Sequence, residues 1–148
     1  MKAKSWIKYF IYMCLILIVV FWGQHVFVVY KQNTQKTFNF NPYYYNVLMI
    51  IFYGSIGLLL GLEHLIYQIR KQGDWAVNFP KIVLMLIPSL YFSLAIFIYY
   101  SNITLLSFPL MGLIENGTNF INAFQIILGY SIITSFYKKE SNRNISIT

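Results

Sequence analysis

Residues 54–75, GSIGLLLGLEHLIYQIRKQGDW, change from an apolar run rich in glycine to a basic pair. The apolar half is typical of a helix in lipid, and Arg70 and Lys71 are typical of the point where such a helix reaches water. Glu63 and His64 lie between these two parts. They either form a functional site within a membrane or belong to the last turns of a spanning helix. The rest of the sequence favours the second interpretation.

The composition indicates a membrane protein. Hydrophobic residues make up 58% of the 148 residues, aromatic residues 20% and charged residues only 10%. A soluble domain carries about 25% charged residues, so this chain has too few polar side chains to cover a globule in water. The net charge of +7 does not indicate nucleic-acid binding, because the basic residues lie between apolar runs and not along one face. The length suits one domain, residues 1–148.

Four apolar runs approach the roughly 20 residues that a helix needs to cross a bilayer. They cover about residues 9–30, 45–69, 82–100 and 120–137, and a short polar tail, 138–148, follows. No small-x-small cleavage site follows the first run, so we interpret it as an uncleaved span. We therefore predict an all-α membrane protein, an antiparallel bundle of four transmembrane helices with short loops.

The basic residues predict the orientation of the bundle. If the N-terminus lies in the cytoplasm, only Lys31 and Lys36 fall on the outer side. Such an excess of inner basic residues in short loops is the positive-inside pattern. We therefore expect a multi-pass protein of the cell membrane with both termini in the cytoplasm. The residues on the expected inner side are Lys2, Lys4, Lys8, Arg70, Lys71, Lys81, Lys138, Lys139 and Arg143.

Prolines predict two irregular segments. Pro88 removes a backbone donor from the third run and is expected to bend it, with Ser89 or a neighbour satisfying the freed carbonyl. Residues 105–114, LLSFPLMGLI, are apolar but too short to cross a membrane. Pro109 and Gly112 are expected to interrupt a regular helix there. The segment either lies at the outer interface and caps the bundle, or is a re-entrant piece shielded by protein.

The second and fourth runs each carry a stripe of small and polar residues. Spacings of three and four place each stripe on one face of a helix. Small residues let helices approach closely and polar residues hydrogen-bond between them, so we predict a helix-packing seam. A polar lining for a substrate path is the alternative. The stripes are Gly54, Gly57, Gly61, His64 and Gln68 in the second run, and Thr118, Asn122, Gln125 and Gly129 in the fourth.

Glu63 and His64 point in different directions, because consecutive residues on a helix do not face each other. Glu63 precedes Arg70 by about 10 Å along the helix axis. It is therefore expected near the inner interface, within reach of Arg70, Lys71 or Lys81. An ionisable group in a span is a functional hypothesis by default, so a proton-linked or ligand-binding role for Glu63 and His64 remains open.

The sequence has no pattern of a catalytic, cofactor or metal site. Cys14 is the only cysteine, which excludes an intrachain disulfide and a CxxC centre. His25 and His64 fall in opposite halves of their spans, roughly 20 Å apart, too far to share one haem or metal. A Gly-rich phosphate loop, HExxH, GxSxG and a close carboxylate pair do not occur. We therefore expect no catalytic residue, no cofactor, no metal and no enzymatic activity.

The predicted function is that of an accessory or interaction subunit of the cytoplasmic membrane, with a sensory, immunity or assembly role. Its expected partners are the lipid bilayer and another membrane protein or a second copy. The alternative is a small oligomeric permease or channel for an ion or small solute. The chain resembles small four-helix multidrug exporters in length and span number, but its first span lacks their carboxylate. It lacks the cysteine pairs of the similarly sized quinone-linked disulfide oxidases.

Overall fold

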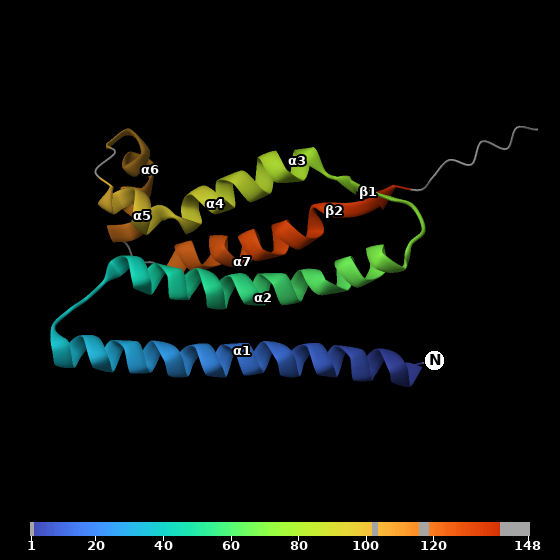
Figure 1. Cartoon of the computed structure of the whole chain (residues 1–148), viewed down its shortest axis with the longest axis horizontal. Helices are drawn as coiled ribbons and strands as arrows, with labels where there is room; N and C mark the ends of the chain where they lie inside the picture. The colour runs from blue at the N-terminus through green and yellow to red at the C-terminus, as the bar shows by residue number, and fades with distance from the viewer. Residues whose placement is uncertain (1, 102–103, 116–118, 140–148) are drawn as a thin grey trace, which may run out of the picture.

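A computed structural model describes residues 2–101, 104–115 and 119–139. Two long helices, α1 (Lys2–Thr37) and α2 (Pro42–Arg70), run antiparallel beside each other (Figure 1). Both are long and apolar enough to cross a membrane, with mean hydropathies of 2.1 and 1.8 in their most apolar parts. The other elements are β1 (Asp74–Val77), α3 (Phe79–Lys81), the π-helical turn η1 (Ile82–Leu86), α4 (Ile87–Ser93), α5 (Ala95–Tyr100), α6 (Thr104–Glu115), α7 (Asn119–Thr134) and β2 (Phe136–Lys139).

The helices form a row in which α2 packs between α1 and α7, and α7 also packs against η1 and α4 (Figure 1). The N-terminus, the end of α2 and the two strands lie at one end of this row, which we call the ribbon end. The α1–α2 connection, α5 and α6 lie at the other end, which we call the α6 end. The described part of the chain is mostly helical, so the predicted helical class fits.

The second helix, α2, begins and ends as its sequence dictates. Asn41 caps α2, because its side-chain oxygen accepts hydrogen bonds from the amides of Tyr43 and Tyr44, each at 3.1 Å, and Pro42 is preorganised for the first helical position. Lys71 is extended and ends α2. The predicted segment 45–69 lies within α2. The helix α1 extends beyond both ends of the predicted segment 9–30.

The predicted third span, 82–100, is divided among η1, α4 and α5. The amide of Ile87 bonds the carbonyl of Ile82, a π-helical turn just before Pro88, where the proline ring and its missing N–H disturb the ladder. The hydroxyl of Ser89 donates to the Met85 carbonyl at 2.6 Å. A second break, which the sequence analysis did not predict, lies at Leu94, where φ is −90° and ψ is 10°.

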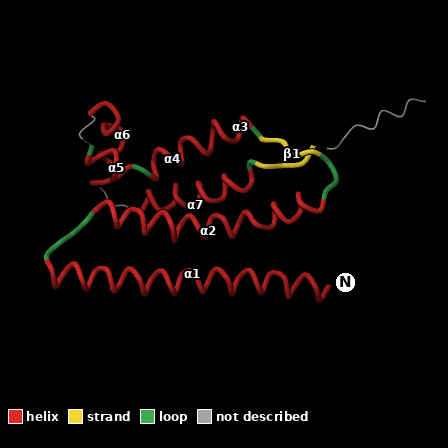
Figure 2. The backbone as a smooth tube through the Cα atoms, viewed as in Figure 1, coloured by secondary structure: helices red, strands yellow, loops and turns green. Residues whose placement is uncertain are grey.

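The predicted fourth span, 120–137, is wrong at its end, because α7 stops at Thr134 and residues 136–139 form β2. This strand pairs antiparallel with β1, with Val77 opposite Phe136 and Asp74 opposite Lys139 (Figure 2). Aromatic residues favour strands. The two chain segments also meet at the ribbon end, where Gly73, with φ of 141°, lets the chain turn after α2. The described part of the chain thus fits the predicted all-α class, with a two-stranded antiparallel sheet in addition to the helices.

The expectation that Pro109 and Gly112 interrupt a helix is also wrong, because α6 continues through both. Leu110 is fully buried, whereas Pro109 and Gly112 lie on the exposed face. Burial of one face of α6 outweighs the loss of one backbone donor at the proline. The core at this end contains Ala95, Leu110 and Ile121, with Tyr91, Phe92, Ile98 and Ile114 packed around them.

Candidate functional site

The predicted seam glycine Gly57 lies at the contact between α2 and α7. A Cβ atom there would collide with the carbonyl oxygen of Ile126 and come within 2.8 Å of the amide nitrogen of Tyr130. Both obstructing atoms belong to the backbone of α7. The two helices therefore touch backbone to backbone at this point, and only glycine allows such an approach.

Gly129 makes the reciprocal contact from α7. A Cβ atom there would collide with the carbonyl oxygen of Gly54 and lie 3.0 Å from the amide nitrogen of Leu58. Gly61 faces side chains instead, with Ile133 at 3.2 Å from a hypothetical Cβ. The closest approach of α2 and α7 is thus at the Gly57 and Gly129 level, and the helices are less tightly opposed at Gly61.

A fully buried polar cluster lies next to this contact. The Gln125 side-chain amide donates to the Asn46 side-chain oxygen at 3.3 Å, and the Asn46 amide donates to the Ser93 carbonyl at 3.2 Å. Asn46, Gln125 and Ser93 have no exposed surface. This cluster joins α2, α4 and α7 through buried hydrogen bonds, and it adjoins the helix break at Leu94.

Asn46 is a site residue that the sequence analysis missed. It lies eight residues before Gly54, about two helical turns, and so on the same face as the predicted stripe. Extending the stripe by two turns would have found it. Its amide group matters because it is the only bridge that the described hydrogen bonds make between Gln125 and the α4 backbone.

Several buried polar atoms near the seam have no hydrogen-bond partner within the described part of the chain. They include the Ser93 hydroxyl, the side-chain oxygen of Gln125, the Ser131 hydroxyl and the side-chain oxygen of Asn122. Unsatisfied buried polar atoms are rare in folded proteins and require an explanation. Thr118, the first residue of the predicted stripe on the fourth run, lies outside the described residues.

His64 and Gln68 hold the strands to α2. The Nε2 atom of His64 lies 3.3 Å from the Phe136 carbonyl oxygen, and the Gln68 side-chain oxygen accepts a hydrogen bond from the Lys138 amide at 3.1 Å. The Lys138 ammonium donates to the carbonyls of Ile69 and Lys71, at 3.3 and 2.9 Å. Cations stabilise the carbonyl-rich end of a helix. These contacts anchor the ribbon end.

Glu63 pairs with Lys8 of α1, not with Arg70, Lys71 or Lys81 as expected. The Lys8 ammonium lies 2.8 Å from the carboxylate, and both side chains are about half exposed, at 41% and 51%. The expectation failed because it did not consider the residues of α1. The antiparallel arrangement brings Lys8 to the level of Glu63. His64 does not join this ion pair. Glu63 and His64 both lie toward the ribbon end of α2, far from Gln125.

Aromatic side chains form most of the contact between α1 and α2. Phe27 packs against Tyr45 and Phe52, with ring centroids 5.7 Å apart in each case. Gly23 is buried beneath the Phe52 ring, which would lie 2.9 Å from a Cβ atom. The Tyr30 hydroxyl donates to the Asn41 carbonyl at 2.9 Å. Aromatic rings thus line the contact between α1 and α2, and open space remains beside them.

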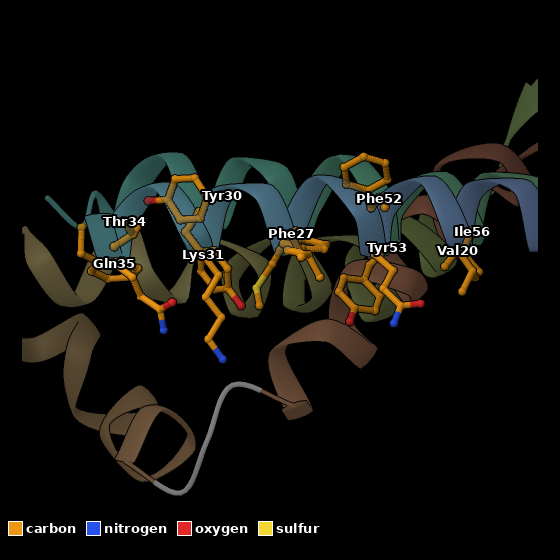
Figure 3. A pocket seen from close by; sticks show the side chains of 15 residues that line it. Val20, Phe27, Tyr30, Lys31, Thr34, Gln35, Phe52, Tyr53 and Ile56 are labelled. Atoms are coloured by element: carbon orange, nitrogen blue, oxygen red, sulfur yellow. The ribbon is translucent and has the colours of Figure 1, made fainter. Parts of the chain in front are cut away.

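The open space is a groove of about 780 Å³ along one side of the α1–α2 contact, which we call the α1–α2 groove (Figure 3). A second, smaller hollow of about 660 Å³ on α1 and α2 includes His25 and Lys36. The α1–α2 groove is lined by Val20, Gly23, Gln24, Phe27, Val28, Tyr30, Lys31, Thr34, Gln35, Phe40, Tyr45, Met49, Phe52, Tyr53 and Ile56.

Comparison with known proteins supplies no function for this chain. No protein-family model, curated protein or solved structure matches it. Within the described residues, no group of three or more His, Cys, Asp or Glu side chains is placed to hold a metal ion. Function is therefore inferred from the geometry of the seam, the polar cluster and the groove.

Proposed function

We propose that the chain is a multi-pass protein of the cytoplasmic membrane with four spans and both termini in the cytoplasm. The spans are α1, α2, the segment from α3 to α5, and α7. The positions of the basic residues support this orientation. Lys8 lies in the N-terminal part of α1, Arg70 ends α2, Lys81 ends α3 and Lys138 lies in β2, and these four positions are toward the ribbon end. Lys31 lies near the other end of α1, toward the α6 end. Such a separation follows the positive-inside rule if the ribbon end faces the cytoplasm.

In this membrane the protein acts as a non-enzymatic interaction subunit, with a sensory, immunity or assembly role. The observation that carries the proposal is the exposure of α1, since only 6% of its most apolar part is buried, against 28% for α2. Gln24 and His25 are exposed within that helix. Polar side chains are costly when they face lipid. A second membrane protein, or a second copy of this chain, that packs on α1 would supply their hydrogen-bond partners.

A photo-cross-linking residue at Val29, one turn after His25, is expected to give a discrete protein adduct in native membranes. The same residue at Leu84, which is 75% exposed and lies on η1, is expected to give lipid adducts only. Gel mobility and mass spectrometry of the adducts measure both outcomes. Lipid adducts alone at both positions would contradict lateral association through α1.

The buried polar cluster favours a second candidate, a small oligomeric permease or channel. Transporter sites combine interrupted helices with buried polar groups near the middle of the membrane, and the break at Leu94 adjoins Ser93, whose hydroxyl has no partner in the described residues. The sequence-based version of this candidate used Glu63, His64, Asn122 and Gln125. Glu63 and His64 lie toward the ribbon end, away from the cluster.

Ser93→Ala is the sharpest test of the permease candidate. Because the Ser93 hydroxyl makes no hydrogen bond in the described structure, its removal is expected to leave the fold intact. If the cluster lines a path, Na⁺, K⁺ or H⁺ flux into proteoliposomes should fall at least about tenfold, the effect of losing one hydrogen bond to an ion. Wild-type flux no higher than that of protein-free vesicles removes this candidate.

A further inference from the structure

The α1–α2 groove changes in polarity along its length. Tyr30, Lys31, Thr34 and Gln35 gather at its α6 end, and Val20 and Ile56 lie at its other end (Figure 3). Phe27 and Phe52 line the middle. Gln24 and Tyr53 also line the groove and contribute polar atoms to it. The groove therefore has a polar head with one cation and a largely apolar body, which is the polarity of an amphiphile.

The length of the groove matches one leaflet of a bilayer. Lys31 and Val20 are eleven residues apart on α1, which corresponds to about 16 Å at the rise of an α-helix. Half of the hydrocarbon core of a bilayer is about 15 Å. An acyl chain whose headgroup meets Lys31 would therefore reach the membrane midplane near Val20, without leaving the groove.

The volume of the groove distinguishes a lipid acyl chain from a protein helix as its occupant. About 780 Å³ lies within the range of about 300–1,000 Å³ that is typical of small-molecule sites. A helix about 10–12 Å wide with a pitch of 5.4 Å would fill the same space with fewer than two turns. A spanning helix therefore does not fit inside the groove, and a single acyl chain does.

Lys31 supplies charge complementarity at the polar end. Its ammonium has no ion-pair or hydrogen-bond partner within the described part of the chain, and Lys31 is exposed. Thr34 lies one turn further along the same helix, and both line the groove. A lysine and neighbouring hydroxyl and amide donors are groups that bind a phosphate.

We propose that the α1–α2 groove binds one anionic phospholipid of the outer leaflet. The phosphate lies at Lys31, with Thr34 and Gln35 as additional donors, and one acyl chain lies along Phe27 and Phe52 toward Val20. This site rests on the membrane placement of the proposed function, but not on its interaction partner. The α1–α2 groove is separate from the α2–α7 seam and from the buried polar cluster, and an anionic phospholipid is its proposed ligand.

Native mass spectrometry of the full chain in detergent tests the site, with phosphatidylglycerol and phosphatidylcholine of identical acyl chains as probes. The wild-type chain is expected to retain one phosphatidylglycerol about fivefold more tightly than phosphatidylcholine, the effect of one lysine near an anionic headgroup. Lys31→Gln is expected to abolish this preference without changing phosphatidylcholine binding. Val20→Trp, which fills the deep end of the groove, is expected to weaken both lipids.

Lys36→Gln is the matched control, because Lys36 lies on the same helix but lines the other hollow, and it should keep the full preference. An equal loss in Lys36→Gln and Lys31→Gln would indicate diffuse charge attraction and overturn the site. Loss of the α1 protein adduct in Val20→Trp, with unchanged lipid binding, would assign the groove to a partner's side chains and also overturn it. A chain that stays monomeric in buffer without detergent would instead refute the membrane placement.

Discussion

Gly57→Ala is expected to destabilise the protein by about 3 kcal/mol, the upper part of the range for overpacking a closely packed site. The added Cβ would lie 2.8 Å from the Tyr130 amide nitrogen and 2.9 Å from the Ile126 carbonyl carbon. Both are backbone atoms, so no side-chain rotation relieves the collision. The helices α2 and α7 must move apart, and the neighbouring Gln125–Asn46 hydrogen bond at 3.3 Å is strained or lost with them.

The measurement is denaturant unfolding in detergent micelles, followed by circular dichroism. Gly54→Ala is the matched control, because the nearest atom to its Cβ is 4.0 Å away. It should be neutral or stabilising, since alanine is favoured over glycine in a helix by about 1 kcal/mol. The two substitutions, one helical turn apart, are thus expected to differ in the sign of their effect on the free energy of unfolding. Equal stability of the two variants would mean that α2 and α7 do not touch at Gly57.

Gln125→Leu is expected to lower the free energy of unfolding by about 1–2 kcal/mol. The Asn46 side-chain oxygen then loses its donor while it stays fully buried. An unsatisfied buried acceptor costs about 1–3 kcal/mol, and hydrogen bonds between spans fall in the lower part of that range. The same unfolding assay in micelles measures the loss.

A double-mutant cycle with Asn46→Leu isolates the bond between the two amides. The double variant should lose less stability than the sum of the two single variants, with a coupling of about 1 kcal/mol. Asn122→Leu serves as the control on the same helix, because the Asn122 side-chain oxygen is buried without a partner in the described structure, so its removal should be neutral or stabilising. Strict additivity of the two leucine variants would mean that the side chains do not interact.

The sequence predicted those parts of the fold that depend on local pattern. The runs 9–30 and 45–69 lie within α1 and α2, because an apolar stretch of this length favours a helix wherever its neighbours lie. Spacings of three and four likewise put Gly54, Gly57 and Gly61 on one face of α2 before any partner was known. That α7 touches this face closely at Gly57 and Gly129 is a fact of the structure.

The errors arose where neighbouring elements outweighed local preference. A proline and a glycine predicted a broken segment at 105–114, yet burial of Leu110 keeps α6 helical. Hydropathy extended the fourth run to Tyr137, but pairing with β1 draws Phe136 and Tyr137 into a strand. In each case the deciding contact comes from a distant part of the chain, and no property of the segment itself reveals it.

From the sequence alone one learns that the chain is dominated by apolar helices, which faces of two of them are small and polar, and where its basic residues concentrate. Only the tertiary structure decided that Lys8 pairs with Glu63, that Asn46 meets Gln125, and that a groove remains beside α1. The physical reason is that hydropathy and periodicity act within one helix. Pairing across helices depends on their relative rotation and axial offset, and these are fixed only when all the faces pack together.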